Sequence, residues 1–205
     1  MIDINKKFLK MNRWVTLFSM TGSEIVKISE HIGRYPDLII TDNEDIESWH
    51  PKMKSLAYLN ILTTISKSNS KNIKVLNKLF EPEHAHQTRI TLHGWLNIIP
   101  AEICETFQIY NGHPGYINEF PELKGKDPVD KIWSRISDYP IIGSVVHEVT
   151  KDVDGGKIIC SAKESSINCT TLEETYITSK RTSLAAWIDF FTNYNNYTIL
   201  KGKED

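Results

Sequence analysis

A chain of 205 residues that is 40% hydrophobic and 24% charged is typical of a globular protein large enough to bury its own core. Its 24 basic and 26 acidic residues give a formal net charge of −2, which excludes the basic surface of a non-specific nucleic-acid binder. No apolar run approaches the ~20 residues that span a bilayer, so no membrane partner is expected.

The N-terminal segment and the cysteines indicate a cytoplasmic protein. Residues 1–12 are charged and lack the apolar core of a secretion signal, and we interpret them as a flexible extension before a single domain at residues 13–200. Cys104, Cys160 and Cys169 form no Cys-x-x-Cys pair, which favours reduced, structural thiols. The oligomeric state stays open between a monomer and a homodimer.

The first half of the chain alternates between short β-branched or aromatic runs and segments with apolar residues at helical spacing. Strands are predicted at residues 13–19, 37–41 and 88–92. A helix is predicted at residues 24–33, where Gly33 provides the stop signal. Residues 56–65 and 73–80 are helical or combine a helix with a strand.

The second half continues this alternation. Helices are predicted at residues 100–107, 128–136 and 172–192, and strands at residues 108–111, 142–149 and 157–162. Repeated strand–helix units predict an α/β fold, with a mainly parallel sheet covered by helices on both faces. Ligands of such sheets bind outside the carboxyl ends of the strands, so the turns after Ser19, Leu92 and Tyr110 are the expected functional positions.

Asn111 and His113 follow one predicted strand and are separated by a single glycine. In extended backbone, side chains two residues apart point to the same face, which places an amide beside an imidazole. An amide can stabilise an oxyanion, and an imidazole can move a proton near neutral pH. Asn-Gly and His-Pro-Gly are also common turn sequences, so the residue types alone leave catalysis and a structural turn both open.

Two further polar segments are ambiguous in the same way. The segment 152–156 (Asp-Val-Asp-Gly-Gly) is typical of a hairpin turn, but a carboxylate in it could also orient His113. Gly22 and Ser23 precede a predicted helix, which is a potential anion site, but Glu24 at the helix start would oppose a phosphate.

The spacing of the remaining histidines does not indicate a metal site. His84 and His86 are two residues apart in a predicted loop, with no third ligand nearby. His31, His50 and His147 have no polar constellation and are interpreted as surface or packing residues.

Over residues 13–191 the chain resembles the folate-dependent formyltransferases, most of all their phosphoribosylglycinamide branch in purine biosynthesis. The most specific motif is Asn111-Gly112-His113-Pro114 followed later by Asp154-Gly155-Gly156. The other similar stretches are residues 17–23, residues 92–96, Pro121 with Gly125, and residues 143–156.

This resemblance implies a Rossmann-like fold and an enzyme of one-carbon metabolism. Its co-substrate would be 10-formyltetrahydrofolate, its acceptor a small-molecule amine of the glycinamide ribonucleotide type, and it would need no metal. Asn111, His113 and Asp154 would be catalytic, with Asn111 and His113 in a solvent-open cleft. The folate would contact Leu96, Asn97, Ile98, Ile99, Val149, Thr150, Asp152 and Val153. The acceptor would contact Gly22, Ser23, Glu24, Pro114 and Gly115.

The chain departs from the family where the acceptor is bound. Glu24 stands where the family has an asparagine that helps to hold the acceptor's phosphate, and Met20 replaces a glycine. Lys180 or a neighbour falls where the family has an acceptor-binding glutamate. The alternatives are therefore an amino-sugar N-formyltransferase, a hydrolase of formyl-folate and a non-catalytic folate-binding protein.

Overall fold

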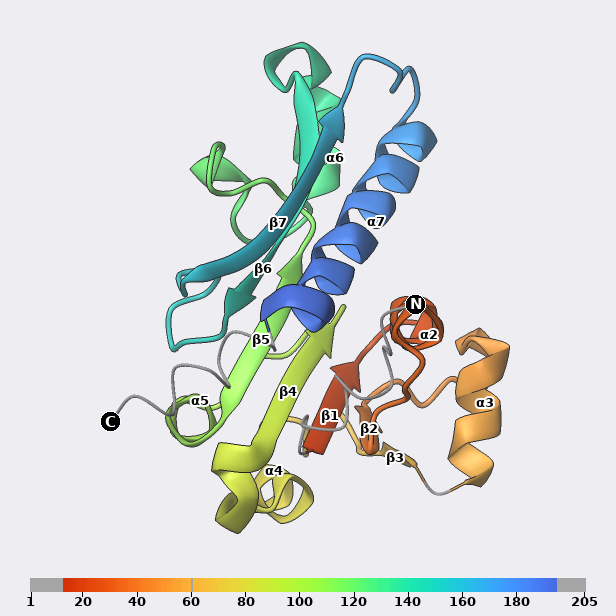
Figure 1. The fold of residues 1–205 in the computed structure, drawn as a ribbon, viewed down its shortest axis with the longest axis vertical. Helices are drawn as coiled ribbons and strands as arrows, with labels where there is room; N and C mark the ends of the chain where they lie inside the picture. The colour runs from red at the N-terminus through yellow and green to blue at the C-terminus, as the bar shows by residue number, and fades with distance from the viewer. Residues whose placement is uncertain (1–12, 60, 195–205) are drawn as a thin grey trace. The chain divides into compact units, whose positions relative to one another are not determined.

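The computed structural model describes residues 13–59 and 61–194, which form a seven-stranded sheet with helices (Figure 1). The strand order is β3-β2-β1-β4-β5-β6-β7. The pairs β1–β2, β1–β4, β2–β3 and β4–β5 are parallel, whereas β6–β7 is antiparallel. This sheet confirms the predicted fold class. The proposed extension at residues 1–12 lies outside the described residues.

The strands are β1 Arg13–Phe18, β2 Leu38–Thr41, β3 Leu62–Thr64, β4 Thr88–His93, β5 Gln108–His113, β6 Ile141–Glu148 and β7 Ile158–Ser165. The α-helices are α2 Ser23–Ile32, α3 Pro51–Tyr58, α4 Ile73–Phe80, α5 Ala101–Thr106, α6 Pro128–Ser134 and α7 Leu172–Asp189. Short 3-10 helices occupy Ile46–Ser48, Pro82–Gln87, Pro121–Leu123 and Ile136–Asp138, and a π-helix at Phe190–Tyr194 extends α7.

The ambiguous region at residues 56–65 contains both a helix and a strand. Helix α3 begins earlier than predicted, at Pro51, because a proline fits the first helical turn and the His50 side chain accepts a hydrogen bond from the Lys52 N–H. The helix ends at Tyr58, and β3 follows it. The predicted loop around His84 and His86 is instead a 3-10 helix that begins with a proline.

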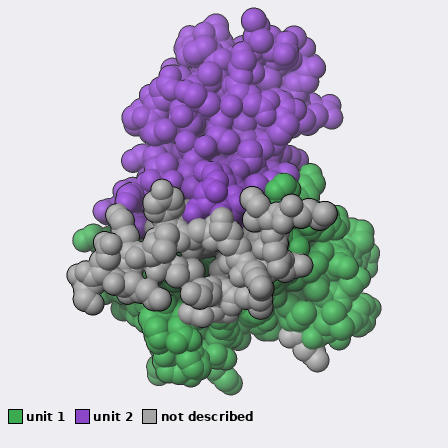
Figure 2. Space-filling view, viewed as in Figure 1, with its two compact units in different colours: residues 1–111, 149–151 green, residues 112–148, 152–205 purple. Residues whose placement is uncertain are grey.

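The chain divides into two compact units (Figure 2). Unit 1 comprises residues 1–111 and 149–151, of which the structure describes residues 13–59, 61–111 and 149–151. Within it, side chains of β1 alternate between the two faces of the sheet. Val15 and Leu17 pack in a cluster with side chains from α4 and α5, whereas Phe18 packs with side chains from α2 and α3. Both faces of this part of the sheet are therefore covered by helices.

Unit 2 comprises residues 112–148 and 152–205, of which the structure describes those up to residue 194. Helix α7 packs on the β6–β7 hairpin, and the buried Ser144 hydroxyl lies 2.9 Å from Thr182 Oγ1. A capping box starts α7: Thr171 Oγ1 accepts a hydrogen bond from the Glu174 N–H, and the Glu174 side chain accepts one from the Thr171 N–H. The hairpin and α7 thus form the frame that carries the turn at residues 149–157.

Gly156 fixes the shape of that turn. A Cβ atom added to it would lie 1.9 Å from the Glu148 carbonyl oxygen, so even an alanine forces the backbone apart. We expect Gly156→Ala to lower the free energy of unfolding by about 1–3 kcal/mol, the usual cost of overpacking. Thermal unfolding measures this, with the exposed Lys151→Ala as the control. Equal melting temperatures for the two variants would contradict the expectation.

Candidate active site

The strand β5 places Asn111 and His113 at its carboxyl end. The strand extends two residues further than predicted, through His113, so the two side chains share one face of extended backbone. His113 does not lie in an open cleft, because its side chain is only 5% exposed. Its Nε2 atom lies 2.9 Å from the Leu123 carbonyl oxygen, and Gly115 packs against the imidazole ring. The expected solvent-open position is therefore wrong for His113.

Asp154 lies in the β6–β7 turn with a left-handed backbone (φ 49°), and its side chain is 9% exposed. Its Oδ2 atom accepts a hydrogen bond from the Gly125 N–H at 2.9 Å and lies 3.4 Å from His113 Nδ1. The two readings of this segment are thus compatible, because Asp154 is a turn residue whose carboxylate also faces His113.

His147 is a site residue that the sequence analysis missed. It was interpreted as a surface or packing residue without a polar constellation, but its Nε2 atom lies 3.3 Å from Asp154 Oδ1. Because β6 and β7 are antiparallel neighbours, the turn between them folds Asp154 back toward the end of β6. The signal was present in the sequence, since His147 and Asp154 both fall within residues 143–156, one of the stretches in which the chain resembles the formyltransferases.

Backbone carbonyls fix the protonation pattern of both imidazoles. His147 Nδ1 lies 2.8 Å from the Glu148 carbonyl oxygen, and His113 Nε2 faces the Leu123 carbonyl oxygen. A carbonyl only accepts hydrogen bonds, so these nitrogens carry protons. The other nitrogen of each ring faces Asp154. A proton taken up by His113 is therefore held at the nitrogen next to this carboxylate.

The electrostatics keep Asp154 ionised. Burial alone raises the pKa of Asp154, but the hydrogen bond from His147, the charge of His113 and the Gly125 N–H outweigh it and lower the pKa to about 2. For His113, burial lowers the pKa of the imidazole, while Asp154 and the Leu123 carbonyl oppose this shift. An ionised carboxylate beside a ring with a lowered pKa is an arrangement suited to proton transfer near neutral pH.

The predicted folate-binding residues are divided between surface and core. Leu96 and Ile98 are 74% and 63% exposed, and Val153 is 64% exposed; Thr150 and Asp152 are also exposed. Ile99 is 4% exposed and lies in the core cluster with Trp95, against which Val149 packs. The Ile99 side chain is therefore buried, and the folate contact of this segment stays a prediction. Asn97 donates a hydrogen bond to Asp42 Oδ2.

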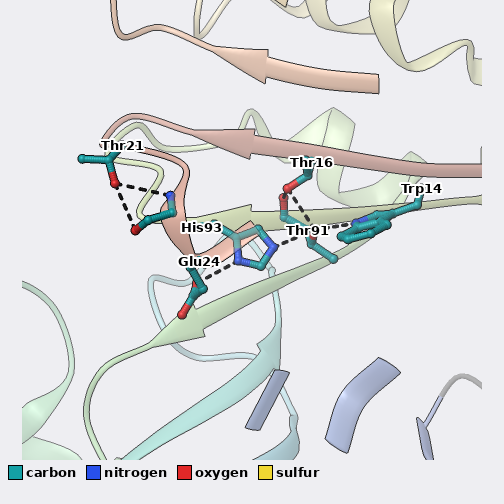
Figure 3. A network of polar contacts seen from close by, with 7 residues as sticks. Trp14, Thr16, Thr21, Glu24, Thr91 and His93 are labelled. Atoms are coloured by element: carbon teal, nitrogen blue, oxygen red, sulfur yellow. Dashed lines mark hydrogen bonds and ion pairs between the residues drawn. The ribbon is translucent and has the colours of Figure 1, made fainter. Parts of the chain in front are cut away.

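The predicted acceptor residues also differ in accessibility. Gly22 has a left-handed backbone (φ 71°) and caps α2 without a side-chain hydrogen bond. Ser23 and Pro114 are partly exposed, whereas Gly115 is buried against His113. Glu24 Oε2 lies 2.8 Å from His93 Nδ1, a contact between residues 69 positions apart that the sequence did not reveal (Figure 3).

Among residues 13–59 and 61–194, no group of three or more His, Cys, Asp and Glu side chains could hold a metal ion. Within the same residues, no helix is both long and apolar enough to cross a bilayer.

The thiols of Cys104, Cys160 and Cys169 are free, and burial together with Asp189 raises the pKa of Cys160 to about 12.

The fold is that of the phosphoribosylglycinamide formyltransferases. The Anaplasma phagocytophilum enzyme is 17% identical, with a TM-score of 0.70 over 86% of this chain and 83% of that one. Glycinamide ribonucleotide transformylase 1 of Geobacillus kaustophilus is 16% identical, with a TM-score of 0.71 over 88% and 97%. A formyltetrahydrofolate deformylase of Pseudomonas syringae is 15% identical, with a TM-score of 0.70 over 91% and 62%. No protein-family model and no curated protein matches the sequence.

Proposed function

We propose that the protein transfers a formyl group from 10-formyltetrahydrofolate to a small-molecule amine. The observation that carries this proposal is the Asp154 carboxylate, which lies between His113 and His147. His113 is at the end of β5, the strand that also bears Asn111. The same fold occurs in enzymes whose names specify formyl transfer to glycinamide ribonucleotide. A purine-biosynthetic role in the cytoplasm is the corresponding cellular proposal.

Each residue has a distinct role in the proposed reaction. The amine nitrogen bonds to the formyl carbon, the bond from that carbon to the folate nitrogen breaks, and the amine proton ends on the folate nitrogen. Asn111 donates a hydrogen bond to the carbonyl oxygen as negative charge builds on it. His113 takes up and returns the proton, and Asp154 stabilises the protonated imidazole. Both His113 nitrogens already have partners, so one contact must yield to the substrate.

The segment after β4 is the proposed contact for the flat ring of the folate. Leu96 and Ile98 are largely exposed apolar side chains in the segment after β4, and backbone groups of the same segment can bind the polar edge of the ring. Val149, which packs near this segment in unit 1, begins the second stretch that we propose to contact the co-substrate. When bound, 10-formyltetrahydrofolate supplies an electrophilic carbonyl carbon.

Hydrolysis of the formyl group is the second candidate function. It is favoured by one observation, the structural similarity to a formyltetrahydrofolate deformylase at a TM-score of 0.70. In that reaction water takes the place of the amine, and the same three residues would serve.

An assay of tetrahydrofolate release separates these functions. We expect release from 10-formyltetrahydrofolate to depend on an added amine, and a formylated amine to appear in equal amount. Release without any amine, with formate as the product, would instead establish the hydrolase. If neither reaction occurs and the folate still binds, the protein is a binding protein and our proposal is wrong.

A further inference from the structure

Gly112 separates the two proposed catalytic residues on β5, and it lies against Trp187 of α7. A Cβ atom added to Gly112 would come within 2.5 Å of Trp187 Nε1 and within 3.0 Å of Trp187 Cε2. Ordinary contacts of a Cβ atom begin at 3.4 Å, so this position has no room for a side chain. The indole therefore occupies the space that a side chain on β5 would otherwise fill.

Space, and not backbone conformation, requires a glycine at this position. Gly112 lies in the extended strand β5 and lacks the positive φ that Gly22 and Gly125 have. A glycine inside a strand weakens the strand and often marks the close approach of another group. Here that group is Trp187, so the absent side chain of Gly112 and the large side chain of Trp187 are complementary.

The ring of Trp187 is held by its neighbours in α7. Trp187 is 0% exposed, meets Phe190 edge-to-face with ring centroids 5.5 Å apart, and lies 6.0 Å from the ring of Phe191. Phe190 and Phe191 are also buried, at the start of the π-helix that extends α7. A side chain at position 112 would therefore displace the end of β5 rather than the indole.

A displacement of Gly112 is transmitted to Asn111 and His113. Side chains alternate between the two faces of a strand, so Trp187 contacts Gly112 on the face opposite to the Asn111 and His113 side chains. His113 Nε2 lies 2.9 Å from the Leu123 carbonyl oxygen, and its Nδ1 atom lies 3.4 Å from an Asp154 oxygen. Misplacement of a reacting group by about 1 Å can lower a rate about 100-fold.

We propose that Trp187 is a positioning residue, whose indole holds Gly112 in place and thereby keeps Asn111 and His113 in the geometry that the reaction needs. This inference rests on the proposed formyl transfer, because Trp187 acts through these two side chains and not on a substrate. It gives helix α7 a role in the site beyond covering the β6–β7 hairpin.

Two single variants and their combination test the contact. Gly112→Ala should lower kcat for tetrahydrofolate release about 100-fold, the cost of a misplaced catalytic group, with little change in KM for the folate. Trp187→Met keeps much of the buried volume, but its flexible side chain no longer fixes the strand and can yield to a methyl group. We expect Trp187→Met to lower kcat about 10-fold, and the double variant to be at least ~10-fold faster than Gly112→Ala alone.

Trp14→Met is the matched control for lost packing. Trp14 is also 0% exposed, but it lies near the start of β1 in unit 1, where its Nε1 atom donates a hydrogen bond to Thr91. This variant should melt at a lower temperature and keep the kcat of the unmodified protein, with every assay run below the melting temperature of the variant. An equal loss of kcat in Trp14→Met, or a double variant no faster than Gly112→Ala, would overturn the positioning role.

The pKa of His113 gives a measurement that needs no folate. Burial and nearby positive charge lower this pKa, whereas Asp154 and the Leu123 carbonyl oxygen raise it. Because the added methyl group moves the ring away from these two partners, the pKa measured from the imidazole NMR signals should fall in Gly112→Ala. It should return toward its original value in the double variant. An unchanged or higher pKa in Gly112→Ala would contradict the proposal.

The two measurements distinguish this inference from the proposed function. The expected pattern of pKa values, without formyl transfer by the unmodified protein, would refute the enzyme and retain the contact that positions His113. Formyl transfer by the unmodified protein, at a rate that Gly112→Ala leaves unchanged, would retain the enzyme and refute the role of Trp187.

Discussion

Alanine in place of either His113 or Asn111 is expected to lower kcat/KM for formyl transfer at least ~100-fold. The loss at His113 is that of a proton-transfer group, and the loss at Asn111 is that of an oxyanion donor. Tetrahydrofolate release by the purified variants, measured at saturating folate, tests both. His31→Ala, an exposed residue of α2, serves as the control that should keep full activity. Activity within a few-fold of the unmodified protein would disprove the catalytic assignment of the residue concerned.

Stability must be measured beside activity for His113. The sequence suggested that its removal would leave the fold almost unaffected, but the imidazole is buried and bonded to the Leu123 carbonyl oxygen. Loss of a buried hydrogen-bond partner costs about 1–3 kcal/mol. The assay temperature must therefore lie well below the melting temperature of the variant, so that the lower rate reports chemistry and not unfolding.

Local sequence patterns were sufficient for most of the fold. The apolar strand β1 and helix α2 begin and end within a residue or two of their predicted bounds, because burial imposes a period of two or 3.6 residues on them. The start of α3 was missed, because its apolar spacing is weak and its signal is a single proline after a capping histidine. The start of this helix is therefore indicated by its capping residues and not by the spacing of its apolar residues.

The candidate site was predictable only where its residues are neighbours in the sequence. Asn111 and His113 lie on one strand, and the turn that bears Asp154 is evident from its glycines. The pairing of Asp154 with His147 depends on the hairpin that folds one onto the other. The pairing of Glu24 with His93 depends on the start of α2 lying beside the carboxyl end of β4. Neither contact leaves a periodic signal in the sequence.

Asp154→Asn is expected to lower turnover about 10- to 100-fold while the folate still binds. Asparagine can keep the turn and the hydrogen bond from the Gly125 N–H, but it removes the negative charge beside His113. The charge of Asp154 raises the pKa of His113, so loss of this charge lowers that pKa further. In the plot of turnover against pH, the change that reflects titration of His113 therefore moves to lower pH. Asp138→Asn, an exposed site with the same change in charge, is the control. An unchanged profile would mean that Asp154 only shapes the turn.

The same variant changes how stability depends on pH. The pKa of Asp154 is about 2 in the folded protein against 3.8 ordinarily, so the ionised carboxylate stabilises the fold above about pH 4. This contribution, about 2 kcal/mol, is lost as the pH falls through the folded-state value. Asp154→Asn lacks it, so its free energy of unfolding should fall less steeply between pH 5 and pH 2 than that of the unmodified protein. Denaturant titrations across this range measure both slopes, and parallel slopes would show that His113 and His147 do not stabilise the charge of Asp154.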